Sequence, residues 1–282
     1  ILGLGSIGKE LAKKASYMGM DVIGMKRTKS HVPYVKKVFT QENIEEIFTS
    51  CDYIVNLLPL TDKTDNLIDK QLFEKMKQDY PDKPLFVYGH SWGSFLAQDF
   101  MQQYPESLDG VILSGTSGKQ DKLNLLLFIG KIVLLFKSKN EEAGLFYKLG
   151  IEPLNKKFKQ DRSPNAWLSS VEAEVKKYDD DPLCGFKPVN GYFLEMALAM
   201  KRFLHPKSEA KIPKELPILL LSGALDPVSN FCKNLYVLIE RYEKLGLNFD
   251  YKIYPQSRHE PHNDVSREEF IADVLAFLNK KL

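Results

Sequence analysis

Apolar and polar residues are distributed along this chain in the pattern of strands separated by helices. Short apolar runs rich in β-forming residues occupy positions 85–88, 108–113 and 217–221, and residues 249–254 alternate like a strand with one buried face. Helical spacing follows them, most regularly over residues 231–245 and 266–278. Strands that alternate with helices in this way predict an α/β fold with a doubly wound, mostly parallel sheet.

The β pattern fades over residues 119–213, where helical spacing takes over. A helical stretch between two strands predicts a cap inserted into the sheet domain. The first part of this stretch, residues 123–136, is nearly apolar all round and carries a single charged side chain, Lys131. We therefore expect a helical cap over about residues 119–213 that begins with an unusually apolar helix.

Residues 1–77 follow a different pattern. A short strand at Ile1 runs into G-x-G-x-x-G, formed by Gly3, Gly5 and Gly8, and a helix and a second strand at residues 21–25 come next. Such a βαβ start is a dinucleotide-binding fingerprint, because its glycines let a pyrophosphate approach the N-terminus of the helix. The pattern predicts a Rossmann-type N-terminal segment.

Two basic residues follow the second of these strands. Lys26 and Arg27 stand where an acidic side chain would bind the ribose 2′-hydroxyl of NAD. Positive charge at this place suits a 2′-phosphate instead. If the segment binds a nucleotide, the sequence therefore favours NADP over NAD.

Composition narrows the choice of partners. A net charge of +2 indicates no particular class of binding partner. The sequence also has no basic stretch interleaved with aromatic residues that would indicate nucleic-acid binding. Cys51, Cys184 and Cys232 lack metal-type or C-x-x-C spacing, so we expect no metal site and a reducing, cytoplasmic location. No signal peptide is recognisable, and no apolar run reaches the roughly 18 residues that a spanning helix needs. The chain starts at Ile1, within a predicted strand, which suggests a fragment or a processed product.

The strongest chemical signal is the motif G-x-S-x-G at residues 89–93. The motif joins the apolar run at 85–88 to a helical stretch, which is the strand, turn and helix context that a nucleophile elbow requires. Such a turn exposes the serine hydroxyl above the edge of the sheet, where a base can reach it. Ser91 is therefore the candidate nucleophile, and the backbone N–H of Trp92 is a candidate oxyanion donor.

A serine nucleophile needs a histidine base and an acid, which follow it in this order along an elbow-type fold: serine, acid, histidine. Asp226 lies in the loop after the strand at 217–221, and His259 lies in the loop after the strand at 249–254. The carboxyl ends of parallel strands share one edge of the sheet. Asp226 and His259 are therefore the candidate acid and base.

Other residues compete for these roles. Asp226 with Pro227 also suits a simple turn, residues 179–181 form an acidic run typical of a solvated loop, and Asp264 is placed to cap the last helix. His90 has a structural role as its simplest interpretation, and His262 comes three residues late in the histidine loop. The order of three strand-end loops favours Ser91, Asp226 and His259 together.

From about residue 80 to residue 282 the chain resembles the α/β-hydrolases of the monoacylglycerol lipase and lysophospholipase group. The resemblance rests on the elbow GHSWGS, the acid loop SGALDPVS, the histidine loop YPQSRHE and the stretch EVKKYDDDPLCGF. It implies cofactor-free hydrolysis of a small acyl ester or lipid, through an acyl-enzyme on Ser91. The apolar residues 123–136 then form either a cap helix packed over the active site or a lid that contacts lipid at a membrane surface.

Residues 1–77 resemble the cofactor domain of D-isomer-specific 2-hydroxyacid dehydrogenases, on the fingerprint, the run CDYIVNLLPL at 51–60 and the residues up to 76. The resemblance implies an alternative function as an NADP-dependent dehydrogenase. The catalytic arginine, glutamate and histidine of that family would lie beyond Lys77, where the hydrolase pattern begins, so hydride transfer is disfavoured. A third alternative is a catalytically inactive relic, and two incomplete patterns in one chain also suit a chimeric or misassembled reading frame.

The two patterns meet near residues 77–84, which divides the chain into a nucleotide-binding fragment at 1–77 and a hydrolase domain at 78–282 that lacks its first strands. One hypothesis is that the strands at Ile1, 21–25 and 53–57 replace the missing ones and complete a continuous sheet, with 53–57 beside 85–88. The loop after residue 57 would then supply the second oxyanion donor from the N–H of Leu60 or Thr61, since Pro59 has no N–H.

Overall fold

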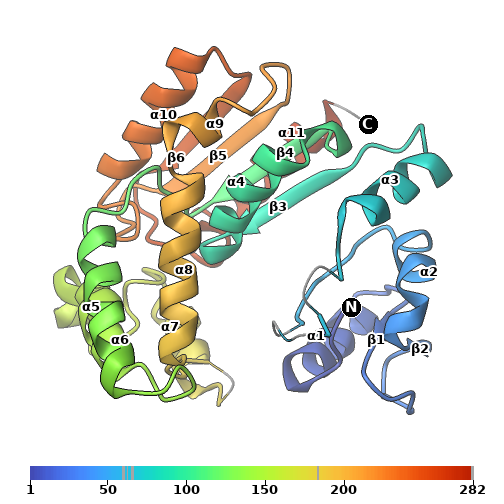
Figure 1. The fold of residues 1–282 in the computed structure, drawn as a ribbon, viewed down its shortest axis with the longest axis horizontal. Helices are drawn as coiled ribbons and strands as arrows, with labels where there is room; N and C mark the ends of the chain where they lie inside the picture. The colour runs from blue at the N-terminus through green and yellow to red at the C-terminus, as the bar shows by residue number, and fades with distance from the viewer. Residues whose placement is uncertain (59–60, 62, 65–66, 183, 281–282) are drawn as a thin grey trace. The chain divides into compact units, whose positions relative to one another are not determined.

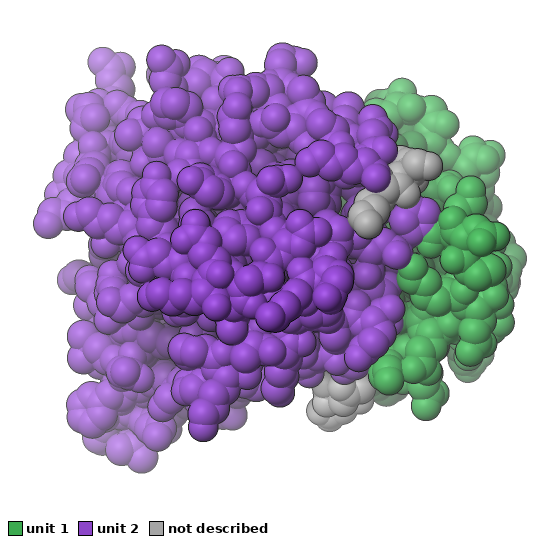
Figure 2. All heavy atoms as spheres, turned by 90° about the horizontal axis from the view of Figure 1, so that it is seen from above, with its two compact units in different colours: residues 1–83 green, residues 84–282 purple. Residues whose placement is uncertain are grey.

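The computed structural model describes residues 1–58, 61, 63–64, 67–182 and 184–280. The chain divides into two compact units, residues 1–83 and residues 84–282 (Figures 1 and 2). Each unit has its own sheet and its own hydrophobic core.

The first unit is a small parallel α/β structure. Strands β1 and β2 pair in parallel, and Leu2 bridges in parallel to both Met25 and Asn56. Its core includes Phe39, Ile47 and Phe48, which are buried. The elements of this unit are α1 (Ser6–Tyr17), β1 (Ile23–Met25), β2 (Lys37–Phe39), the 3₁₀ turn η1 (Gln41–Asn43), α2 (Ile44–Phe48) and α3 (Lys70–Asp79).

The second unit is built on four parallel strands in the order β3-β4-β5-β6. These strands are β3 (Phe86–His90), β4 (Gly110–Ser114), β5 (Ile218–Gly223) and β6 (Phe249–Tyr254). The helices that cover the sheet are α4 (Trp92–Gln103), α10 (Lys233–Leu245) and α11 (Arg267–Asn279), with short turns η2 (Pro105–Ser107) and η5 (Pro261–Asn263). The predicted α/β fold with a parallel sheet is confirmed.

Period-two alternation divides the buried strand residues between the two faces of this sheet. Val111, Leu113 and Leu220 belong to a core with residues of α4 and α10, whereas Ile112 and Leu221 pack with residues of α11. Helices therefore cover both faces, which explains why the central strands are almost continuously apolar in sequence. This arrangement leaves the strand ends free to carry functional loops.

The described strands form a two-stranded sheet in the first unit and a four-stranded sheet in the second, so the continuous sheet across the two units stays a prediction. The segment at 53–57 pairs within its own unit along one edge. The Leu2 N–H donates to the Val55 carbonyl at 2.8 Å, and the Leu57 N–H donates to the Leu2 carbonyl at 2.8 Å. The backbone groups on this side of the segment are thus already satisfied by the first strand of the fingerprint.

Between β4 and β5 the chain forms the predicted helical cap. In Figure 1 the long helices α5 and α8 of the cap lie side by side. No helix among the described residues is long and apolar enough to cross a membrane. The cap comprises α5 (Leu123–Phe136), α6 (Gly144–Gly150), η3 (Glu152–Lys157), η4 (Lys159–Asp161), α7 (Glu172–Asp180), α8 (Asn190–Phe203) and α9 (Pro206–Glu209).

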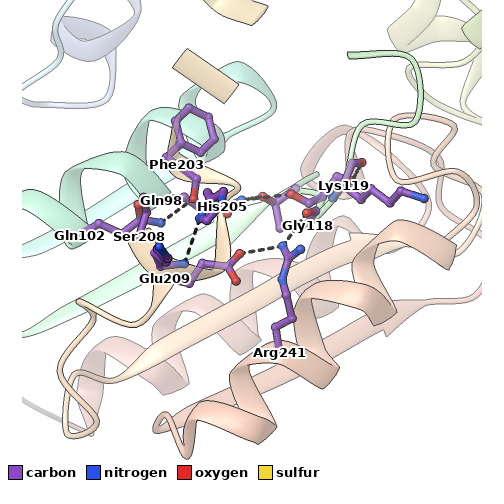
Figure 3. Close-up of polar contacts among 12 residues, drawn as sticks. Gln98, Gln102, Gly118, Lys119, Phe203, His205, Ser208, Glu209 and Arg241 are labelled. Carbon is purple, nitrogen blue, oxygen red and sulfur yellow. Dashed lines mark hydrogen bonds and ion pairs between the residues drawn. The ribbon is translucent and has the colours of Figure 1, made fainter. Parts of the chain in front are cut away.

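Polar side chains from the sheet domain hold both ends of the cap (Figure 3). At its start, the Gln98 side-chain N–H group on α4 donates to the Thr116 hydroxyl at 2.7 Å. At its end, Gln102, one turn further along α4, donates to the Phe203 carbonyl at 3.0 Å. One helix of the sheet domain therefore binds the cap where the chain enters it and where the chain leaves it.

Arg241 on α10 repeats this arrangement from a second helix (Figure 3). Its guanidinium donates to the Gly118 carbonyl at the cap entrance and to the Glu209 carboxylate on α9 at 2.6 Å. Glu209 is fully buried. Burial raises the pKa of Glu209 to about 7, against the opposing effect of the Arg241 charge. The cap is thus fixed to the sheet domain by hydrogen bonds and a buried ion pair at its two ends.

Candidate active site

Ser91 occupies a strained turn between β3 and α4. Its backbone has φ 53° and ψ −122°, a region that residues with a Cβ atom rarely adopt. The Ser91 N–H donates to the Ser114 carbonyl at the end of β4 at 2.9 Å, which holds the turn against the sheet. A Cβ on Gly89 would lie only 2.3 Å from the Gly93 carbonyl oxygen, so the first glycine of the motif is required for strand and helix to approach this closely.

Asp226 and His259 come together from two different strand-end loops. His259 Nδ1 lies 3.0 Å from Asp226 Oδ1, and both side chains are buried, with exposed fractions of 1% and 0%. The same Asp226 oxygen accepts the Val228 N–H at 2.8 Å, which fixes the carboxylate. A carboxylate beside Nδ1 keeps the proton on that nitrogen and leaves Nε2 as the proton acceptor.

The charge of Asp226 also sets the basicity of His259. Burial of the ring opposes its protonated form, but the charge and hydrogen bond of Asp226 outweigh this effect, so the pKa of His259 is raised. Within the described residues its Nε2 atom is buried and has no hydrogen-bond partner. A free acceptor nitrogen of raised basicity is what a general base requires.

The turn after β4 adjoins both Ser91 and His259. Ser114 accepts the Ser91 N–H, and a Cβ on the next residue, Gly115, would lie 3.0 Å from His259 Cε1. Gly115 has φ +58°, which also favours glycine at this position. The carboxyl ends of the neighbouring strands therefore deliver the candidate nucleophile, acid and base to one edge of the sheet.

Two further histidine rings lie against the candidate base. The ring centroid of His90 is 4.9 Å from that of His259 and 4.5 Å from that of His262. Burial lowers the pKa of His90 to about 2 and also lowers the pKa of His262. Both rings are therefore neutral at pH 7 and place no positive charge beside His259. The structural role expected for His90 suits this position.

Sequence reasoning assigned no role in catalysis to Trp167 or Arg258. In the structure the Trp167 ring centroid is 5.0 Å from that of His259, and Arg258, adjacent to His259, binds the Trp167 segment. Arg258 stands within the histidine loop YPQSRHE, beside the candidate base, whereas no motif marks Trp167.

The structure describes the first candidate oxyanion donor, the backbone N–H of Trp92. Trp92 is the first residue of α4, so its N–H lies ahead of the intrahelical acceptors and is available for a ligand. Of the two candidates for the second donor, Leu60 lies outside the described residues, and the Thr61 N–H already donates to the Thr64 hydroxyl at 2.8 Å.

The fingerprint of the first unit has the geometry of a phosphate cradle. A Cβ on Gly8 would lie 2.0 Å from the Gly3 carbonyl oxygen, so this position must be glycine. Gly5 caps the N-terminus of α1 and has open space where a Cβ would stand. Lys26 and Arg27 follow β1, and the Lys26 ammonium donates to the Ser30 hydroxyl at 2.9 Å. These residues fit the phosphate groups of a dinucleotide.

Comparison with known families divides the chain in the same manner as the sequence patterns. The family described as serine aminopeptidase, S33 matches residues 62–266, which is most of the chain. The NAD-binding domain of D-isomer specific 2-hydroxyacid dehydrogenases matches residues 1–80. Both resemblances drawn from the motifs are confirmed.

Individual relatives give the same division. Mouse monoglyceride lipase is 27% identical over 201 residues, which are 69% of this chain and 57% of that protein. The chain thus spans little more than half the length of this relative. Glyoxylate/hydroxypyruvate reductase B of an Enterobacter species is 35% identical over 80 residues, which are 28% of this chain and 24% of that protein.

Solved structures support the hydrolase fold. A thermostable carboxyl esterase from Bacillus coagulans aligns with a TM-score of 0.68 and 28% identity, over 74% of this chain and 69% of that chain. A lipase in its open form aligns with a TM-score of 0.66 and 22% identity, over 75% and 69% of the two chains, which shows the fold alone. With a family match across residues 62–266, this chain belongs to the serine aminopeptidase S33 family of α/β-hydrolases.

Proposed function

We propose that this protein is a serine hydrolase that cleaves carboxylic esters through an acyl-enzyme on Ser91. The observation that carries the proposal is the buried pair of His259 and Asp226, 3.0 Å apart, at the sheet edge where the strained Ser91 turn lies. The chain's likeness to a carboxyl esterase and to monoglyceride lipase supports the same chemistry.

Each residue has one task in the proposed reaction. His259 Nε2 takes the proton of the Ser91 hydroxyl as the Oγ atom forms a bond to the acyl carbonyl carbon, and the Trp92 N–H binds the resulting oxyanion. Asp226 stabilises the imidazolium. His259 then gives its proton to the departing alcohol oxygen as the ester bond breaks, and water releases the acid by the same sequence of steps.

A fluorophosphonate probe tests this proposal directly, because it reacts covalently with activated serines. We expect the purified protein to be labelled, the adduct to map to the peptide that contains Ser91, and p-nitrophenyl butyrate to be hydrolysed. A folded protein that neither reacts with the probe nor turns over the ester would contradict the proposal and favour the inactive relic.

We further propose monoacylglycerols or lysophospholipids as the substrate class, with lipid contact through α5. The helix buries Leu127 and Gly130 against the cap but exposes a set of large apolar side chains, including Leu135 and Phe136 at 77% and 84%. An apolar surface of this kind suits a membrane interface or the acyl chain of a lipid. One face of α5 is packed and the other is exposed, and the exposed face supports the proposed lipid contact.

Vesicle flotation tests the lipid contact. We expect the protein to float with phosphatidylcholine vesicles. The double change Leu135→Ser with Phe136→Ser is expected to lower the vesicle-binding constant about thirtyfold, since each lost side chain removes apolar area worth ~1 kcal/mol, or about 2 kcal/mol together. Leu275→Ser on α11, where the side chain is also about half exposed, serves as the control and is expected to leave binding unchanged. Equal flotation of all variants, or none by the wild type, contradicts the contact.

A second candidate activity is nucleotide binding by the first unit, and we propose NADP as the ligand. The cradle at Gly3, Gly5 and Gly8 supports a dinucleotide, and Lys26 with Arg27 supports the 2′-phosphate. When bound, the cofactor would supply hydride chemistry. The matching reductases share only residues equivalent to the first 80, so hydride transfer is not part of the proposal.

Thermal denaturation with NADPH separates a working cradle from a vestigial one. We expect NADPH at a hundredfold excess over its Kd to stabilise the first unit by about 2.7 kcal/mol, and NADH to do less. Gly5→Ala is the informative variant, because the fold leaves room for its Cβ while a bound phosphate would not. It is expected to keep the unliganded Tm and lose the NADPH shift. No shift in the wild type contradicts the proposal.

A further inference from the structure

One segment of the cap is bound directly to the loop that carries His259. The His259 N–H donates to the Trp167 carbonyl at 3.4 Å, and the Glu260 N–H donates to the Leu168 carbonyl at 2.8 Å. The Ser169 hydroxyl donates to the Asn263 carbonyl at 2.8 Å. The cap residues around Trp167 and the histidine loop therefore form one hydrogen-bonded structure.

The Trp167 side chain lies on the imidazole of the candidate base. The two ring centroids are 5.0 Å apart with 37° between the ring planes, and the indole is only 9% exposed. Trp167 belongs to a buried cluster against which Val228 and Phe231, which follow Asp226 in the chain, also pack. The indole thus contacts His259 and belongs to a cluster that reaches residues following Asp226.

Arg258 holds Trp167 in this place. Its guanidinium donates to the Ala166 carbonyl at 2.6 Å and to the Ser169 carbonyl at 3.1 Å, on either side of Trp167 in the chain. It also pairs with Asp161 and lies 4.2 Å from the centroid of the Phe158 ring. The backbone N–H of Trp167 donates to the side-chain oxygen of Asn155 at 3.0 Å. The indole is therefore fixed by its own backbone rather than by packing alone.

An aromatic face this close to an imidazole favours the charged form of that ring, because the π electrons attract a cation within about 6 Å of the centroid. The proposed reaction forms an imidazolium at His259 each time a proton leaves Ser91. The other ionisable groups around His259 are Asp226 and Glu260, which favour this charge, and His90 and His262, whose rings are neutral.

We propose that Trp167 is a positioning residue of the proposed hydrolase: its indole orients the His259 ring and stabilises the imidazolium that forms during acyl transfer. This inference rests on the proposed function. It also explains why the cap, rather than the sheet domain alone, contributes to the geometry of the base.

Two substitutions of Trp167 test the inference through the pH dependence of ester hydrolysis. Trp167→Leu removes the aromatic face, and we expect a fall in kcat of about 3- to 30-fold with little change in KM, as the strength of a cation–π contact implies. The acidic limb of the kcat/KM profile is expected to move to lower pH by about 0.5 to 1.5 pH units, since the imidazolium becomes less stable. Trp167→Phe keeps a smaller aromatic face and is expected to lie between Trp167→Leu and the wild type.

Leu168→Ala is the matched control, because Leu168 is a buried neighbour in the same cluster and its backbone carbonyl, which the substitution keeps, binds the histidine loop. It loosens the cap segment without removing the indole, so we expect a lower Tm and an unmoved acidic limb. The inference is overturned if Trp167→Leu leaves the acidic limb in place, or if Leu168→Ala moves it equally.

A measurement without substrate separates this inference from the proposed function. With ¹³C-labelled histidine, an NMR titration reports the pKa of His259, whose signal His259→Asn identifies by its loss. Trp167→Leu is expected to lower that pKa by the same 0.5 to 1.5 pH units. If Trp167→Leu lowers the pKa of His259 but the wild-type protein hydrolyses no ester, the contact between Trp167 and His259 is supported and the proposed hydrolase function is contradicted. An unchanged pKa in an active esterase would reject the role of Trp167.

Discussion

Ser91→Ala is expected to lower the turnover of p-nitrophenyl butyrate by about a millionfold and to abolish labelling by a fluorophosphonate. Loss of the nucleophile in a serine hydrolase removes the covalent step entirely, which leaves only the contributions of substrate binding and the oxyanion donors. The assay is initial-rate kinetics with mass spectrometry of the labelled protein. Ser208→Ala is the control, because this hydroxyl lies on α9 and donates to the Arg202 carbonyl.

The backbone of Ser91 provides a second check on the same residue. At φ 53° and ψ −122° any side chain with a Cβ atom is strained, whereas glycine is not. Ser91→Gly is therefore expected to lose activity as Ser91→Ala does, yet to raise the free energy of unfolding by ~1 kcal/mol relative to Ser91→Ala, measured by urea denaturation. If both variants keep wild-type turnover, another residue is the nucleophile.

Asp226→Asn is expected to reduce kcat by about 10⁴-fold with little loss of fold. An asparagine fills the same buried space but carries no charge, so it neither fixes the proton on His259 Nδ1 nor stabilises the imidazolium. Because Asp226 raises the pKa of His259, its neutralisation is also expected to shift the acidic limb of kcat/KM to lower pH. Rates measured from pH 4 to pH 9 would report both effects.

Asp264→Asn is the matched control for the acid. Asp264 is also buried and lies close to His259 in the chain, but its carboxylate accepts the Arg258 N–H at 2.8 Å and binds Ser170. Its neutralisation is expected to lower stability and to reduce kcat less than tenfold. A larger loss of kcat from Asp264→Asn than from Asp226→Asn would show that Asp226 is not the acid that acts on His259.

The hydrophobic pattern predicts the positions of strands in the second unit but not where they end. The apolar runs at 85–88, 108–113 and 217–221 correspond to β3, β4 and β5, but the observed strands end one or two residues later. His90 continues β3 because its backbone pairs with Ser114, and Gly223 continues β5 because it pairs with Tyr254. The hydrophobic pattern records which side chains are buried, whereas a strand ends where its backbone hydrogen bonds end.

Strand pairing in the first unit could not be predicted in the same way. The run around residue 55 has the composition of a buried parallel strand. This composition is compatible with pairing to any strand that has an unpaired edge. The structure pairs it with Leu2 through both flanking backbone hydrogen bonds. Side-chain composition predicts a strand here but does not identify Leu2 as its partner.

The sequence by itself determined the fold class, the two family resemblances and the choice of Ser91, Asp226 and His259, because each of these is written in local features: strand-end loops, glycine spacing and residue order. Only the tertiary structure decided what surrounds the candidate base. Trp167 and Arg258 are 91 positions apart in the sequence, yet Arg258 in the histidine loop binds the carbonyls on either side of Trp167, whose ring lies against His259. Their contact depends on how the cap folds back onto the histidine loop, and the periodicity of a segment predicts its buried face but not the residues it will meet there.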